Sequence, residues 1–101
     1  MTTPSDEATA TGHVTLRYWA SARAAAGTDQ DEVEVEVGGT VTLADLVAEA
    51  RTRHADSPRF ADVLACCSVM VGDRPVTSED AATVRVAPGA SVEFLPPFAG
   101  G

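Results

Sequence analysis

The chain of 101 residues is long enough for one compact domain with a modest core, and its apolar fraction of 45% is that of a globular protein. Fifteen acidic and seven basic side chains give a formal charge of −8 at pH 7, which repels phosphate backbones and anionic membranes and argues against binding to nucleic acid or membrane. Apolar runs fall far short of the roughly 18 residues that a transmembrane helix needs. Since no signal-peptide pattern is present either, we expect a cytoplasmic protein.

The N-terminal region predicts a disordered extension followed by a first strand. Residues 1–11 contain Asp6 and Glu7 but no basic residue and no hydrophobic stretch. From His13 onward apolar and polar side chains alternate, which is the period of a half-buried strand whose core side is Val14, Leu16 and Tyr18. We therefore expect residues 1–11 to be an extension and the folded domain to span residues 12–95.

The next two segments are interpreted as a helical turn or loop and a second strand. Residues 21–27 are rich in alanine and predict a helical turn or a loop that ends at Gly27. Residues 31–37 alternate almost without exception and predict a strand with one solvated face. Its core side is expected to be Val33, Val35 and Val37, and its solvated side Glu32, Glu34 and Glu36.

A main amphipathic helix is predicted after the break at Gly38-Gly39. Thr42, followed three residues later by Asp45, resembles an N-cap with an acidic first turn. The apolar stripe expected to pack on the sheet is Leu43, Leu46, Val47 and Ala50, and the basic last turn is Arg51, Arg53 and His54. A second helical piece opens at Pro58 and repeats the spacing in Phe60, Val63, Leu64 and Cys67.

The last third of the chain predicts strands joined by turns. Residues 68–71 and 74–76 flank Gly72-Asp73 as a hairpin, and residues 83–86 and 91–95 are expected to be two further strands around the Pro88-Gly89 turn. Strands that flank one main helix, without repeating strand-helix units, predict an α+β domain. A single sheet should cover one face of that helix.

The sequence contains few side chains in arrangements typical of catalytic or metal-binding sites. His13 and His54 belong to no spaced ligand or nucleophile motif and are interpreted as surface side chains. Cys66 and Cys67 are adjacent, so they do not offer the spaced ligands of a metal site, and we interpret them as reduced core thiols. No metal and no bound cofactor are expected.

The C-terminus carries the most informative pattern. Leu95 ends an apolar strand, and Pro96-Pro97 should stop sheet pairing because proline has no backbone N–H group. The sequence then closes with Phe98-Ala99 and Gly100-Gly101, and a glycine pair without side chains is narrow enough to enter a slot in another protein. We expect residues 96–101 to form an extended tail of roughly 20 Å. Its α-carboxylate at Gly101 is the group available for chemistry, once a partner activates it.

These residues resemble a known family. Residues 91–101, with the sequence Ser-Val-Glu-Phe-Leu-Pro-Pro-Phe-Ala-Gly-Gly, resemble the ending of MoaD/ThiS-type sulfur carriers, and the Pro-Pro-x-Ala-Gly-Gly form is most like the small subunit of molybdopterin synthase. Residues 16–20, the Gly27 turn and the Thr42-x-x-Asp45-Leu46 helix start also match the family layout. The resemblance covers residues 13–101. It implies a β-grasp, ubiquitin-like fold with a mixed sheet of about four to five strands on one main helix, the first and last strands side by side, and a protruding tail.

The resemblance also implies a function. A ubiquitin-activating-enzyme-like adenylyltransferase would consume ATP at Gly101, and a desulfurase or rhodanese type of donor would supply sulfur to form a thiocarboxylate. The large subunit of molybdopterin synthase would accept the tail and pass the sulfur to a pterin precursor, so this chain would not be catalytic alone. By position, the expected partner-binding residues are Phe94, Leu95, Pro96, Pro97, Phe98, Ala99 and Gly100.

Two alternatives share the chemistry of this tail. A sulfur carrier for thiamine-thiazole or cysteine biosynthesis is an alternative to the molybdopterin carrier, because it uses the same tail chemistry. An activated Gly101 is also open to attack by an amine, so a ubiquitin-like modifier that is conjugated to partner lysines is a further hypothesis. A plain interaction module is the third class.

Overall fold

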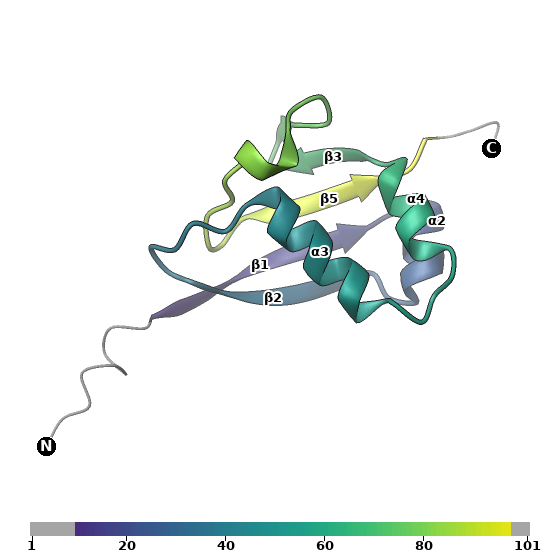
Figure 1. Cartoon of the computed structure of the whole chain (residues 1–101), viewed down its shortest axis with the longest axis horizontal. Helices are drawn as coiled ribbons and strands as arrows, with labels where there is room; N and C mark the ends of the chain where they lie inside the picture. Colours follow the sequence, from purple (N-terminus) through teal and green to yellow (C-terminus); the bar gives the residue numbers. More distant parts are fainter. Residues whose placement is uncertain (1–9, 98–101) are drawn as a thin grey trace, which may run out of the picture.

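Five strands form one mixed sheet in the computed structural model, which describes residues 10–97. The strands are β1 (Thr11–Tyr18), β2 (Gln30–Glu36), β3 (Ser68–Val71), β4 (Arg74–Pro75) and β5 (Ser91–Leu95). They lie in the order β2-β1-β5-β3-β4, with β1 and β5 parallel and the other neighbours antiparallel. Figure 1 shows the first and last strands side by side in the middle of the sheet. This arrangement confirms the predicted α+β class and the β-grasp, ubiquitin-like fold.

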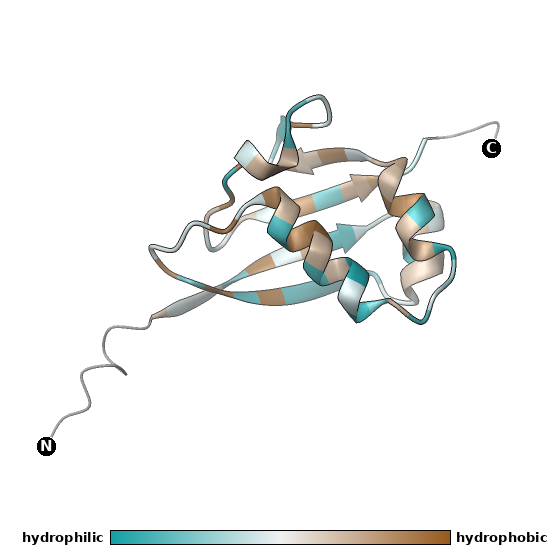
Figure 2. Ribbon diagram, in the orientation of Figure 1, coloured by the Kyte–Doolittle hydropathy of each residue, from teal (hydrophilic) through white to brown (hydrophobic). Residues whose placement is uncertain are grey.

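The helices pack on the sheet through one hydrophobic core. They are α2 (Ala20–Ala26), α3 (Leu43–Arg53), α4 (Phe60–Ala65) and the short 3-10 helix η1 (Ala81–Thr83). Figure 2 shows hydrophobic bands on α3 and on the strands beneath it. The fully buried larger side chains come from both layers: Tyr18, Phe60, Phe94, Leu16, Leu46, Val14, Val76, Val84 and Val92. Among residues 10–97, no helix has the length and apolar character that crossing a bilayer requires.

The β1–β2 pair follows the alternation, with two boundary differences. Val33 and Val35 point into the core, and Val14 lies opposite Val33. Val37 was predicted to join them, but 55% of it is exposed because β2 ends at Glu36. At the same end of the pair β1 begins at Thr11, earlier than His13, since Thr11 lies opposite Glu36 and the Val37 N–H group donates to the Ala10 carbonyl. Residues 1–9 of the predicted extension lie outside the described residues.

The main helix begins where the capping pattern predicts. The Thr42 N–H group donates to Asp45 Oδ2 at 3.0 Å, and the Asp45 N–H group donates to Thr42 Oγ1 at 3.2 Å, a complete capping box. The side chains of Leu43, Leu46 and Ala50 are buried against the sheet. The alanine-rich segment is a helix, α2, and Gly27 ends it at φ 78°, in the left-handed region that favours glycine.

The strand predicted over residues 83–86 is wrong. Thr83 belongs to η1, and Arg85 makes only an isolated bridge to Thr42. The alternation is real, because Val84 and Val86 are both buried. Their hydrogen bonds go to the loop before α3: the Leu43 N–H group donates to the Val84 carbonyl, and the Val86 N–H group to the Val41 carbonyl. The segment thus fastens the start of the helix and does not extend the sheet.

A polar cluster lies at the edge of the core. The buried Tyr18 hydroxyl donates to Asp31 Oδ2 at 2.8 Å, and His54 Nε2 lies 2.6 Å from the same oxygen. The His54 ring also contacts the rings of Tyr18 and Phe60, at centroid distances of 5.6 and 4.7 Å. Burial, and secondly the Asp31 hydrogen bond, raise the pKa of Tyr18. The prediction that His54 is a surface side chain is therefore wrong, because Asp31 and two aromatic rings enclose it.

We expect Asp31→Ala to lower the free energy of unfolding by about 1–3 kcal/mol, because it removes the acceptor of a buried hydroxyl. Asp31→Asn retains an acceptor oxygen for Tyr18 and should cost less. Urea unfolding monitored by circular dichroism measures both. Asp29→Ala is the matched control, since that side chain is 76% exposed, and equal stability of the Asp31→Ala and Asp29→Ala variants would contradict the prediction.

Candidate functional site

The exit point of the C-terminal segment is fixed by the central position of β5. This strand is paired on both sides, with Phe94 opposite Tyr18 of β1 and Leu95 opposite Ser68 of β3. The Trp19 N–H group donates to the Phe94 carbonyl at 3.2 Å. Pro96 follows and has no N–H group to continue the pairing. The chain therefore leaves the sheet at one defined place, between two other strands.

Phe94 anchors this exit from inside the core. Its side chain is 1% exposed and stacks on the Tyr18 ring at a centroid distance of 5.8 Å. A partner cannot reach it in the folded domain, so the expectation that Phe94 contacts a partner is corrected to a structural role. Leu95 points to the opposite face of the sheet and is half-buried.

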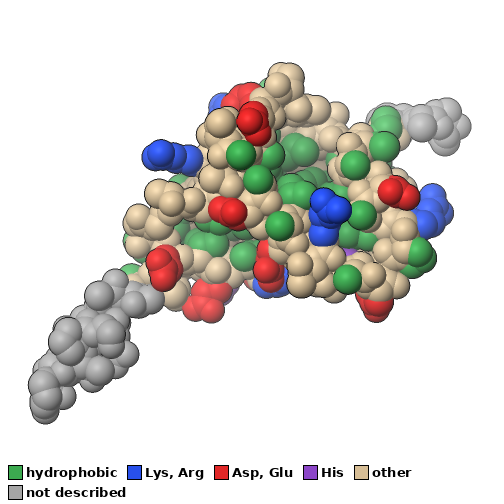
Figure 3. Space-filling view, in the orientation of Figure 1, with side chains coloured by type: hydrophobic (Ala, Val, Ile, Leu, Met, Phe, Trp, Pro, Cys, Tyr) green, Lys and Arg blue, Asp and Glu red, His purple; other side chains and the backbone are tan. Residues whose placement is uncertain are grey.

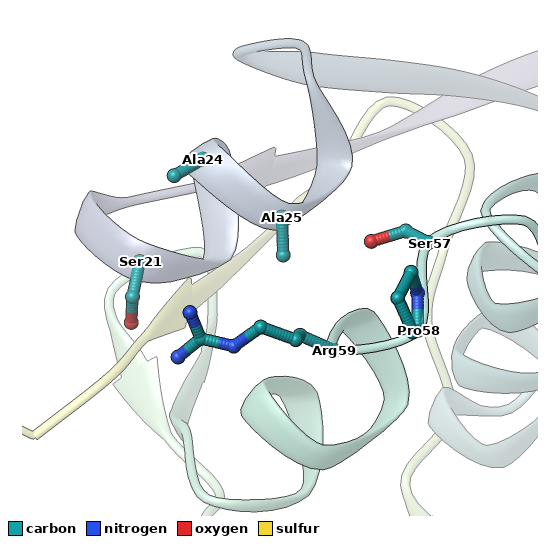
Figure 4. A pocket seen from close by; sticks show the side chains of 6 residues that line it. All are labelled: Ser21, Ala24, Ala25, Ser57, Pro58 and Arg59. Carbon is teal, nitrogen blue, oxygen red and sulfur yellow. The ribbon is translucent and has the colours of Figure 1, made fainter.

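Pro96 and Pro97 border a groove formed by two helices. The remaining lining comes from Ser21 of α2, from Arg59 just before α4, and from Asp62, Val63 and Cys66 of α4 and its C-cap. The groove has a volume of about 400 Å³. Figure 4 shows a neighbouring pocket of about 260 Å³, in which the Arg59 side chain extends from the start of α4 toward Ser21. Arg59 thus lies beside the first residues of the tail.

The outer face of the sheet presents an aromatic side chain near the same exit. Trp19 is 40% exposed, and the Arg17 guanidinium lies 5.2 Å from the centre of its ring. The alternation along the first strand places Trp19 with Thr15 and Arg17, on the side away from the core, although no functional role was predicted for it. Figure 3 shows the other, helix-covered face, where apolar side chains gather between the helices and charged ones lie around them.

The two cysteines differ in environment. Cys67 is buried and its thiol donates to the Val63 carbonyl, with 3.3 Å between sulfur and oxygen, whereas Cys66 is exposed and lines the groove beside Pro96. The prediction of two core thiols is therefore wrong for Cys66. Burial, and secondly the neighbouring Cys66, raise the pKa of the Cys67 thiol to about 11.

Within residues 10–97 the structure shows no catalytic constellation. No group of three His, Cys, Asp or Glu side chains in this range is arranged to hold a metal ion. His54 is engaged by Asp31. His13 is exposed on β1, two residues before Thr15, where the pairing with β5 begins. The predicted tail residues Phe98, Ala99, Gly100 and Gly101 lie outside the described residues. The described chain provides the scaffold, the exit and the groove beside it.

A family model and several solved structures are similar to this chain. The model of the ThiS family matches residues 16–101. A putative molybdopterin converting factor, subunit 1, from Pyrococcus furiosus is 23% identical, with a TM-score of 0.66 over 85% of this chain and 98% of that one. Small archaeal modifier protein 1 structures are also similar: the one from Haloferax volcanii is 21% identical (TM-score 0.67; 89% and 100% covered), and the one from Methanosarcina acetivorans 14% identical (TM-score 0.65; 91% and 99% covered). At these identities the structural matches establish the fold alone. A comparison with curated protein sequences gave no match.

We expect Phe94→Ala to destabilise the domain by about 3–5 kcal/mol, because it leaves a cavity against Tyr18 in the core. Leu95→Ala, the neighbouring control on the other face, should cost much less. Urea unfolding compares the two, and Phe94→Leu provides a measurable variant if the alanine variant does not fold. Equal losses for Phe94→Leu and Leu95→Ala would contradict the assignment of Phe94 to the core.

The buried thiol predicts an alkaline loss of stability. Cys67 titrates near pH 11 in the folded state against about 9 when exposed, so between these values the unfolded chain binds fewer protons. The free energy of unfolding should then fall as pH rises, by at most about 1.4 kcal/mol per pH unit from this group. Urea unfolding between pH 9 and 10 should show a shallower fall for Cys67→Ala than for the unaltered chain. Cys66→Ala, which removes an exposed thiol, should keep the full slope; equal slopes in all three proteins would refute the prediction.

Proposed function

The chain belongs to the ThiS family, and from this premise we propose that it is a sulfur carrier whose terminal glycine is adenylated and then converted to a thiocarboxylate by partner enzymes. The observation that supports this most is the geometry of the exit. A central strand, paired on both sides, ends directly at Pro96-Pro97. The four residues that follow, Phe-Ala-Gly-Gly, therefore start from a rigid support.

The chemistry requires steps that the chain does not perform alone. A carboxylate is a poor electrophile, so an oxygen of the Gly101 carboxylate would attack the α-phosphorus of ATP, and pyrophosphate would leave. The outer sulfur of a donor persulfide would then attack the carbonyl carbon, and AMP would leave with the electron pair. A thiol reductant would supply two electrons to split the resulting acyl disulfide into the thiocarboxylate and the donor thiol. ATP is consumed by a ubiquitin-activating-enzyme-like adenylyltransferase, and the sulfur comes from a desulfurase or rhodanese type of donor. This chain binds no cofactor of its own in the proposal.

For the destination of the sulfur we propose molybdopterin, with this chain as the small subunit of the synthase. The Pro-Pro-x-Ala-Gly-Gly ending supports that choice, and so does the fold shared with the putative molybdopterin converting factor subunit of Pyrococcus furiosus. The large subunit would receive the tail in a channel lined to fit Phe98, Ala99 and Gly100. Leu95, Pro96 and Pro97 would border that contact. The same tail fits thiamine-thiazole or cysteine biosynthesis, which use the same thiocarboxylate.

A second candidate is a ubiquitin-like modifier joined to partner amines through Gly101. The fold shared with the small archaeal modifier proteins favours it. The two functions differ in the nucleophile that attacks the activated carboxyl group, sulfur in one and an amine in the other. Covalent adducts in a cell lysate that vanish when Gly101 is deleted would favour the modifier.

Loading with sulfur tests the carrier proposal. The purified chain is incubated with a family adenylyltransferase, ATP and a sulfur donor, and its intact mass is measured. We expect one oxygen to be replaced by one sulfur, located at Gly101 by fragmentation. Deleting Gly101, or adding one alanine after it, should abolish loading and leave the unfolding curve unchanged. If the chain stays unloaded while another carrier is loaded in the same mixture, the proposal fails.

A further inference from the structure

The basic side chains of this chain share one chemical property. All seven Lys and Arg positions in residues 1–101 are arginine: Arg17, Arg23, Arg51, Arg53, Arg59, Arg74 and Arg85. A guanidinium stays protonated in proteins and has no free electron pair with which to attack a carbonyl carbon. A lysine amine loses its proton to a small extent at neutral pH and is then a nucleophile. The chain thus carries positive charge without side-chain amines.

Local contacts do not account for this choice at every position. Arg53 pairs with Glu49 one helical turn away at 2.9 Å, and Arg74 pairs with Glu79 at 2.9 Å, both at partly exposed sites. Lysine serves such exposed pairs as well as arginine does, and the pairs contribute little to stability. A structural preference for guanidinium therefore explains a site such as Arg53, which also donates to the Glu32 carbonyl at 3.0 Å, but not all seven.

Arg59 occupies the position where an amine would matter most. It lines the groove that Pro96 and Pro97 border, at the start of the tail. The four residues after Pro97 span at most about 14 Å when extended. A lysine at position 59 would therefore lie within reach of an activated Gly101 on the same chain, at the high effective concentration of an intramolecular reaction.

We propose that this chain is a one-way acyl donor, whose activated C-terminus acylates partners but is not captured by side chains of its own copies. The inference rests on activation at Gly101 in the proposed function. In the step that is avoided, an amine nitrogen attacks the Gly101 carbonyl carbon and a C–N bond forms. The C–O bond to AMP breaks, AMP leaves with the electron pair, and the amine proton passes to water. The resulting amide would end the carrier cycle.

The two candidate functions make different use of this property. In a sulfur carrier, it reserves the activated carboxyl group for the sulfur donor. In a modifier, it limits each acceptor lysine to a single copy, because a second copy needs a lysine on the first. Cys66 lies on the same groove and is exposed, but a thioester formed there exchanges with free thiols and returns the acyl group.

A chemically installed thioester tests the inference without an activating enzyme. The chain is released from an intein fusion with 2-mercaptoethanesulfonate, which leaves a thioester at Gly101, and is incubated at mildly alkaline pH with excess free thiol. Arg59→Lys is compared with the unaltered chain and with Arg85→Lys, which keeps the charge but lies at the other end of β5, in the segment bridged to Thr42. Intact mass and peptide mapping follow amide formation and separate side-chain products from those of the backbone α-amine.

We expect Arg59→Lys to form an intramolecular amide at position 59 roughly tenfold faster than Arg85→Lys forms one at position 85, because only the first is within reach of the tail. The unaltered chain should give thioester hydrolysis and no side-chain amide. An Arg59→Lys protein that forms no amide at position 59, or forms it no faster than Arg85→Lys does at position 85, would overturn the inference. The rates of amide formation are measured without the sulfur-loading assay. Failure of that assay would instead overturn the proposed function, and with it the biological role given to the absence of side-chain amines.

Discussion

The structure depends on the parallel pairing of β1 with β5. This contact brings the first and last strands of the described chain together in the sheet, so that β5 has a partner strand on each side. Phe94 stacks on Tyr18 across this pair, and Tyr18 in turn donates to Asp31, which also contacts His54. The position of the last strand is therefore set by packing with β1, β2 and the end of α3. A displaced β5 would break an aromatic stack and leave a buried hydroxyl without its acceptor.

Such an exit differs from an ordinary terminus because it lies between strands. Trp19 and Ser68 lie beside the end of β5, one on each side. Pro96 and Pro97 remove two consecutive donors at this point. The sheet thus holds the chain at Leu95, and the chain can leave the sheet within the next two residues. This combination suits a segment that must be presented from a fixed place and yet leave the domain surface.

Local patterns predicted the elements whose partners are close in sequence. The Thr42–Asp45 capping box and the inward valines of β2 follow from spacing alone, because their contacts lie within one helix turn or one strand face. Val84 and Val86 show the same alternation, yet they pair with the loop before α3, a contact between segments about 40 residues apart that no local pattern encodes. The burial of His54 depends on Asp31, 23 residues earlier. For the adjacent cysteines, only the packing of the α4 C-terminus decides which thiol faces the core. The side-by-side arrangement of β1 and β5 was predicted from the family resemblance and not from a local pattern.

The roles of the polar side chains follow from their positions relative to the core and to the tail. In residues 10–97 the polar side chains with unusual surroundings, Tyr18 and His54, are used to hold the fold, and Arg59 places charge without a nucleophile beside the tail. A carrier benefits from both features, because any reactive group near an activated carboxyl competes with the intended acceptor at high effective concentration. Selectivity can therefore reside in the partner that binds the tail, while the carrier itself contributes rigidity and chemical inertness. In the proposed function the choice of arginine and the choice of proline serve the same end: arginine keeps side-chain amines away from the tail, and proline keeps the tail out of the sheet.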